Sequence, residues 1–134
     1  PIIIGMFQKE VAQRVAAKPN NKSYGILSVL IQAYYDVTYL YDVPPTCFNP
    51  PPKVMSGVIK LNLKNTSVVV KSDNNFIQLV KAAFNQRRKT LSNSLHKYNL
   101  KEAFLNHPFA KLRPENLSVG QFIELTQYIE KNNQ

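Results

Sequence analysis

A chain of 134 residues with 44% apolar residues can bury a core as one domain or two small ones, which excludes wholesale disorder. Its single cysteine, Cys47, excludes an internal disulfide and a thiolate-rich zinc site, and we expect the reducing cytoplasm as its compartment. The net charge of +9 is concentrated in residues 71–113, and this basic block predicts a polyanionic partner such as RNA or DNA, with a solvated face that aids solubility as the alternative.

The chain opens within an apolar run rather than with Met, so we expect it to be part of a longer protein. Its first residues have neither the basic region nor the cleavage site of a signal peptide. The longest uncharged stretch, residues 23–35, is too short to span a bilayer. It also contains Ser28 and Gln32, which fits a buried helix better than a membrane span.

The first half of the chain has an α/β pattern. Residues 2–7 are a continuous apolar run, typical of a strand buried on both faces of a parallel sheet. Apolar residues at helical spacing predict helices over residues 9–17 and 27–34. Strands are predicted over residues 37–43 and 54–63, on either side of a proline-rich loop. This order predicts the second half of an α/β sheet whose last two strands pair as neighbours.

The second half of the chain has a helical pattern. A connector over residues 65–72 precedes a helix that Asp73 is expected to cap. Short helices are predicted over residues 90–95 and 100–105, and a final helix from Ser118 onward. The chain contains no Gly-rich turn after a strand, no P-loop and no H-x-E with C-x-x-C, so no nucleotide cofactor or metal is expected to bind it.

The proline-rich loop presents an aromatic residue, Phe48. Three consecutive prolines fix the backbone and remove three N–H donors, so the loop is expected to be stiff. An enzyme that modifies a base takes the base out of the stack and holds it against apolar faces, which Phe48 could supply. Alternatively, Phe48 plugs the end of the sheet. The candidate substrate loop comprises Phe48, Asn49, Pro50, Pro51, Pro52 and Lys53.

The basic block contains three consecutive cations, at residues 87–89, and nine lysines and arginines against two acids. On a helical path these three side chains fan over most of the circumference, so at least one should meet solvent or the preceding part of the chain. Arginine binds phosphate bidentately, and amides add hydrogen bonds. The candidate RNA contacts are Lys81, Asn85, Gln86, Arg87, Arg88, Lys89, Lys97 and Lys101.

Five segments, in order along the chain, resemble the small-subunit rRNA adenine N6,N6-dimethyltransferase family, which includes the erythromycin-resistance methyltransferases. They are MFQKEVA at residues 6–12, YGILSV at 24–29, DVPP with FNPPPKVMS at 42–56, residues 82–95 around FNQRRKTL, and RPENLS at 113–118. The resemblance implies the C-terminal part of a Rossmann-like methyltransferase sheet over residues 1–66 and a helical rRNA-binding domain over 67–134.

By the resemblance, the parent protein is a monomeric cytoplasmic enzyme of ribosome biogenesis. It would use S-adenosylmethionine to methylate N6 of two adjacent adenines twice, near the 3′ end of small-subunit (16S) rRNA. Phe48 would stack on the flipped adenine. The family's donor-binding loop and Asn-Leu/Ile-Pro-Tyr motif have no counterpart in this sequence, so the chain alone is expected to be inactive and to bind no methyl donor. Ser92 stands where the family usually has Arg.

Two other functions are compatible with the basic block. One is a non-catalytic RNA-binding or ribosome-assembly module that docks on the immature small subunit, and it is the main alternative. The other is a DNA-binding transcription factor descended from the same fold. The enzyme fragment and the RNA-binding module both predict an RNA affinity that falls steeply with salt.

Overall fold

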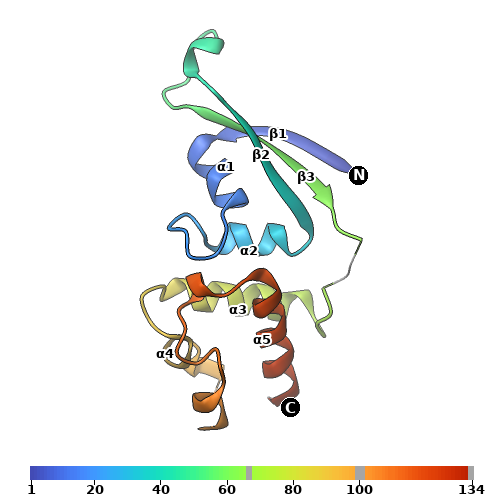
Figure 1. Cartoon of the computed structure of the whole chain (residues 1–134), viewed down its shortest axis with the longest axis vertical. Coiled ribbons are helices and arrows are strands. Elements are labelled where there is room, and N and C mark those ends of the chain that lie inside the picture. Colours follow the sequence, from blue (N-terminus) through green and yellow to red (C-terminus); the bar gives the residue numbers. More distant parts are fainter. Residues whose placement is uncertain (66–67, 99–101, 133–134) are drawn as a thin grey trace.

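The computed structural model describes residues 1–65, 68–98 and 102–132. A three-stranded sheet with two helices lies above a group of helices in Figure 1. The elements are β1 (Ile2–Gln8), α1 (Lys9–Ala16), α2 (Ile26–Gln32), β2 (Tyr35–Val43), η1 (Pro45–Cys47), β3 (Ser56–Leu63), α3 (Asp73–Asn85), α4 (Leu91–Ser94), η2 (His96–Tyr98), η3 (Glu102–Asn106), η4 (Pro114–Asn116) and α5 (Val119–Asn132). The predicted order of strand, helix, helix, strand, strand is confirmed.

The sheet has the strand order β1-β3-β2, and β3 runs antiparallel to both neighbours. The predicted pairing of the last two strands is confirmed, with Val37 opposite Leu61 and Thr38 opposite Lys60. The register shifts between Tyr39 and Tyr41, which identifies a bulge near the end of β2. Beyond this bulge, Tyr41 to Val43 continue to pair with β3, and the proline-rich loop follows.

Strand β1 differs from the expectation of a strand buried in a parallel sheet. It pairs antiparallel with β3, and its side chains are largely exposed, with Ile4 at 63%. The reason is that an apolar run predicts apolar side chains on both faces of a strand. It does not predict which strand is its neighbour, or whether the two run parallel or antiparallel. Within the described residues, β3 is the one strand that pairs with β1.

Helices α1 and α2 cover one face of the sheet (Figure 1). Ala12 and Val15 of α1 pack with Ile59 of β3 in a small core. Helix α2 buries two polar side chains that bind the end of α1: Ser28 donates to the Arg14 carbonyl, and Gln32 Nε2 donates to the carbonyls of Val15 and Ala17 at 2.8 and 2.7 Å. Such bonds satisfy carbonyls that a helix C-terminus leaves unpaired.

The larger core joins α2 to the helical half of the chain. It contains Tyr24 and Val29 beside Phe76 of α3 and Phe122 of α5, all fully buried. Apolar burial on this scale is the main stabilising term in folding. Because this core contains described residues from both sides of the predicted boundary, that boundary separates two kinds of secondary structure that share one core. The domain division itself stays a prediction.

Two predicted helix features need correction. Ser72, not Asp73, caps α3, because its hydroxyl accepts a hydrogen bond from the Asn74 N–H at 3.2 Å while Asp73 is the first helical residue. The helix predicted over residues 100–105 is the 3-10 helix η3, and its predicted first residues lie outside the described part of the chain. Ser118 does cap α5, in a reciprocal box with Gln121.

Candidate nucleic-acid interface

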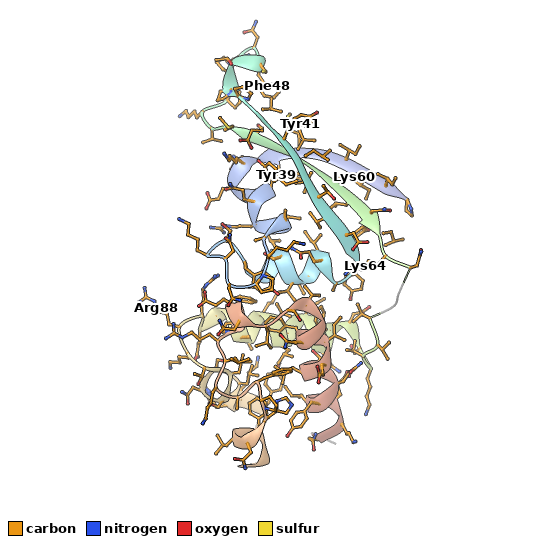
Figure 2. All side chains as sticks on the ribbon, in the orientation of Figure 1. Tyr39, Tyr41, Phe48, Lys60, Lys64 and Arg88 are labelled. Carbon is orange, nitrogen blue, oxygen red and sulfur yellow. The ribbon has the colours of Figure 1, made fainter. Side chains whose placement is uncertain are left out.

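The loop between β2 and β3 extends beyond the end of the sheet, and Phe48 lies at this end of the molecule (Figure 2). It is built on the single turn η1, in which the N–H groups of Cys47 and Phe48 donate to the carbonyls of Pro44 and Pro45 at 3.1 and 3.2 Å. The Phe48 side chain is half-buried. The rest of the predicted substrate loop, residues 49–53, is exposed, and the Asn49–Pro50 peptide is cis.

The base of this loop is held by a polar cluster on one side of the sheet. Lys9 Nζ binds the Asp42 carboxylate at 3.0 Å, and the Tyr39 phenol donates to the same carboxylate. The hydrogen bond from Tyr39 and the nearby Lys9 lower the pKa of Asp42, while burial and Asp42 raise the pKa of Tyr39 to about 12. The Tyr39 ring lies so close to Gly57 that an added Cβ there would collide with it, which explains the glycine.

Five of the predicted RNA contacts have exposed side chains. They are Lys81 and Asn85 on α3, Arg88 and Lys89 in the turn after it, and Lys97 in η2. Arg88 points away from the protein in Figure 2. Exposed side chains of this kind can contact phosphates, although Lys97 also lies over the Tyr98 ring, 5.3 Å from its centre.

Arg87 and Gln86 differ from their neighbours because both point inward. Arg87 donates to the carbonyls of Tyr24 and Asn21 at 2.6 and 3.3 Å, and Gln86 Oε1 is buried with no hydrogen-bond partner within the described residues. The expectation that one of the three cations meets the preceding part of the chain is therefore confirmed for Arg87. Lys101 lies outside the described residues.

Ser92, at the position where the resemblance leads us to expect Arg, lies in the first turn of α4. Its hydroxyl is 3.1 Å from that of Thr90, and its N–H donates to the Ala110 carbonyl at 3.0 Å. The side chain is half-buried. It thus contributes to local packing and adds no charge to the basic block.

Three further aromatic or basic residues of the sheet half lie outside the predicted set. Tyr41 is 57% exposed on β2, Lys60 lies on β3 opposite Thr38, and Lys64 follows β3 (Figure 2). The alternation of residues 54–63 places Lys60 on the face away from Ile59 and α1, so the sequence pattern could have identified it.

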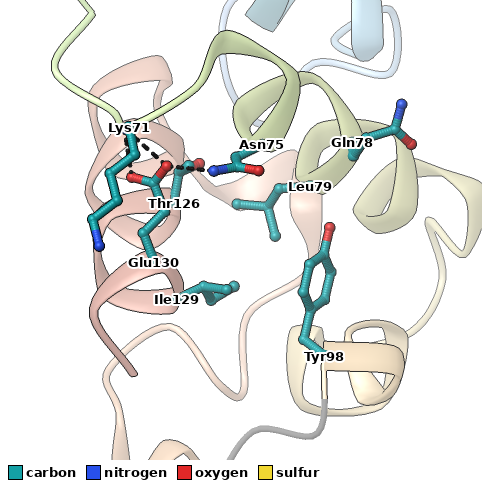
Figure 3. A pocket seen from close by; sticks show the side chains of 8 residues that line it. All are labelled: Lys71, Asn75, Gln78, Leu79, Tyr98, Thr126, Ile129 and Glu130. Carbon is teal, nitrogen blue, oxygen red and sulfur yellow. Dashed lines mark hydrogen bonds between the residues drawn. The ribbon is translucent and has the colours of Figure 1, made fainter. Parts of the chain in front are cut away.

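A cavity of about 330 Å³ lies between α3 and α5 (Figure 3). On its rim, Glu130 accepts hydrogen bonds from the Lys71 N–H at 2.9 and 3.0 Å and from Asn75 Nδ2 at 2.6 Å. Partial burial raises the pKa of Glu130, but these N–H donors outweigh it and hold the pKa below its ordinary value. Since the carboxylate is already occupied, the cluster serves to join α5 to the connector.

An open groove of about 750 Å³ runs between the start of α2 and the end of α3. Its walls include Arg14, Lys22, Phe84 and Arg87. Arg14 is paired with Glu10 at 2.7 Å, four residues earlier on α1. The groove therefore adjoins the basic block on the side where Arg87 meets the first half of the chain.

Within the described residues, no group of three His, Cys, Asp or Glu side chains could hold a metal ion. None of the helices described is long and apolar enough to cross a membrane.

Comparisons with known proteins agree with these features. Residues 2–131 match the family model for ribosomal RNA adenine dimethylase. The chain is 50% identical over 129 residues to ribosomal RNA small subunit methyltransferase A of Cytophaga hutchinsonii, covering 96% of this chain and 50% of the relative. It is 51% identical over 131 residues to the protein of the same name from Phocaeicola vulgatus, covering 97% of this chain and 47% of that protein. The chain thus spans about half the length of the curated relatives it matches.

Solved structures give the same result. A dimethyladenosine transferase from Plasmodium falciparum superposes with a TM-score of 0.85 at 25% identity, covering 98% of this chain and 59% of that one. The 23S rRNA methyltransferase ErmE superposes with a TM-score of 0.60 at 18% identity, over 95% of this chain and 55% of that one, and so shares the fold. From the family match and the sequence identities together, the chain belongs to the ribosomal RNA adenine dimethylase family.

Proposed function

We propose that the chain is the target-recognition part of an S-adenosylmethionine-dependent enzyme that dimethylates N6 of two adjacent adenines near the 3′ end of small-subunit rRNA. Its sheet and α1–α2 would form the C-terminal part of the enzyme's Rossmann-like domain. The helical half would hold the immature small subunit. Membership of the family and the names of the relatives support this proposal.

The position of Phe48 is the observation that carries the proposal. A target adenine must leave its stack before its exocyclic nitrogen can be reached, and a flipped base is held by stacking on apolar side chains. Phe48 is half-buried on a loop that extends beyond the sheet, and the Lys9–Asp42–Tyr39 cluster holds the base of that loop. The ring is therefore positioned by the fold and remains accessible to a base.

The residues present do not fit a methyl donor. The chain has four glycines, and Gly5 and Gly57 lie in strands while Gly25 and Gly120 lie at or in helices, so none forms a donor-binding turn. In the proposed enzyme, the donor would be bound by residues that correspond to the half of the relatives' length that this chain does not match. The work of these residues is to bind RNA and to orient the adenine.

A non-catalytic RNA-binding module is the second candidate. It is favoured by the lack of any donor-binding fingerprint in the sequence and by the five exposed RNA-contact candidates Lys81, Asn85, Arg88, Lys89 and Lys97. The two candidates agree on RNA affinity. They differ in whether adenines in the target are preferred.

Binding of the chain to an unmodified RNA hairpin from the 3′ end of small-subunit rRNA tests the proposal. We expect the logarithm of the affinity to fall linearly with the logarithm of the salt concentration, by about 0.7–0.9 for each phosphate neutralised. Arg88→Gln should reduce this slope by about 1, because an exposed phosphate contact is lost. Lys131→Gln, at an exposed cation outside the basic block, is the matched control and should leave the slope unchanged.

A second hairpin, with the two adjacent adenines replaced by uridines, separates the candidates. We expect slightly weaker binding to it, by less than about threefold, because a uracil offers Phe48 a smaller stacking face than an adenine does. Equal affinity for both hairpins would favour the non-catalytic module. No measurable binding to either hairpin at low salt would contradict both candidates.

A further inference from the structure

Arg87 occupies a different environment from the two cations that follow it. Its guanidinium donates to the carbonyl of Tyr24 at 2.6 Å and to that of Asn21 at 3.3 Å. It also lies 3.8 Å from the Glu115 carboxylate and 5.8 Å from the centre of the Phe84 ring. Four groups from three separate parts of the chain therefore surround one planar side chain.

The loop that Arg87 holds, residues 18–25, connects α1 to α2 in the sheet half. Residues 113–117 hold it from the other side: the Asn20 N–H donates to the Glu115 carbonyl and the Asn116 amide donates to the Asn20 side chain, both at 2.8 Å. The buried Tyr24 phenol donates to the Leu117 carbonyl at 2.7 Å. Asn20 has a φ of 69°, a conformation that asparagine tolerates better than most residues.

We propose that Arg87 is a positioning residue, which latches the loop of residues 18–25 to α3 and η4 and thereby fixes the sheet half relative to the helical half. The guanidinium suits this role because its planar fork donates several hydrogen bonds in fixed directions. A phosphate at Arg87 would compete with two carbonyls and the Glu115 carboxylate for the guanidinium. Arg88 and Lys89 have exposed side chains and are free of that competition.

The latch has a consequence for RNA recognition, and this part rests on the proposed function. Phe48 and Arg88 lie at well-separated places on the molecule (Figure 2). An RNA that contacts both residues binds with higher affinity when their separation is fixed, because the second contact then forms within the same complex. Arg87 would set that separation without touching the RNA.

Distance measurement by electron paramagnetic resonance tests the latch without RNA. One spin label is placed on the native Cys47, which is exposed beside Phe48, and the other on an exposed position of α5 through Glu124→Cys. We expect Arg87→Gln to broaden or displace the distance distribution of the otherwise unchanged chain. Arg88→Gln is the matched control, and its distance distribution should superimpose on that of the parent chain. An Arg87→Gln distribution that also superimposes would overturn the latch.

Two further variants keep the test decisive if Arg87→Gln folds poorly. Glu115→Gln removes one charged partner and should broaden the distribution less. Arg87→Lys keeps the charge but lacks the planar fork, so we expect it to resemble Arg87→Gln. A lysine that restored the parent distribution would overturn the latch, because charge alone would then suffice.

Hairpin binding separates positioning from direct phosphate contact. Arg87→Gln should weaken binding of the hairpin about tenfold, because Phe48 and Arg88 would no longer be held at a fixed separation. The dependence of the affinity on salt should stay unchanged, because no phosphate contact is lost. A slope reduced by about 1 would identify Arg87 as a phosphate contact and overturn the proposal. If the parent chain binds no RNA, the proposed function fails, while the distance measurement still decides the latch.

Discussion

Phe48→Ala is expected to reduce methyl transfer about 100-fold when this chain is joined to the donor-binding half of a relative, because a misplaced target base loses much of the advantage of a fixed reacting geometry. Binding of small-subunit RNA should change by less than about threefold, since phosphate contacts supply most of the affinity. The measurement is transfer of labelled methyl groups to unmodified small subunits, beside a binding titration.

Two substitutions control for this loss. Phe48→Tyr keeps an aromatic face and should retain most of the activity, since stacking depends on the ring. Tyr41→Ala removes another exposed aromatic ring, from β2 rather than from the loop, and should leave transfer unchanged. If Phe48→Ala reduced methyl transfer and RNA binding by the same factor, this would contradict the stacking role of Phe48.

The second large effect concerns the shared core. Phe76 is fully buried on α3 among residues from α2 and α5. Phe76→Ala should lower the free energy of unfolding by about 3–5 kcal/mol, through lost burial and the cavity left behind. Since a domain of this size has about 5–15 kcal/mol in total, the variant should lose much of its stability.

Chemical denaturation followed by circular dichroism measures this change. Leu105→Ala, at a residue 59% exposed on η3, is the control and should stay within about 0.5 kcal/mol of the parent. Because one core joins α2 to α3 and α5, the sheet and helical halves should unfold in a single transition. Separate transitions for the two halves would contradict the shared core.

The elements of the sheet half could largely be predicted from the sequence. Alternation over residues 54–63 and the β-rich run over 37–43 identified β3 and β2, and the loop between them made them neighbours. The direction and exposure of β1 could not be predicted, because an apolar run does not encode its partner. Ser72 was missed as a cap because it lies beside Asp73, which is an equally good capping residue.

The candidate interface was predictable only in part. Residue types identified the basic block, and five of its eight predicted contacts have exposed side chains in the structure. The roles within it were not predictable, because Arg87 meets partners 63 and 66 residues away in the sequence. A helical projection shows that three consecutive cations point in different directions. Which group each of them contacts depends on the tertiary fold. Whether the exposed cations bind RNA stays a prediction.

Joining this chain to the donor-binding half of a relative tests the central claim most directly. The joined protein is incubated with S-adenosylmethionine and unmodified small subunits, and the RNA is digested and analysed by mass spectrometry. We predict N6,N6-dimethyladenosine at two adjacent positions near the 3′ end, and none with this chain alone. Absence of dimethyladenosine from a folded joined protein, or methylation of another base, would contradict the claim that this chain directs the enzyme to those adenines.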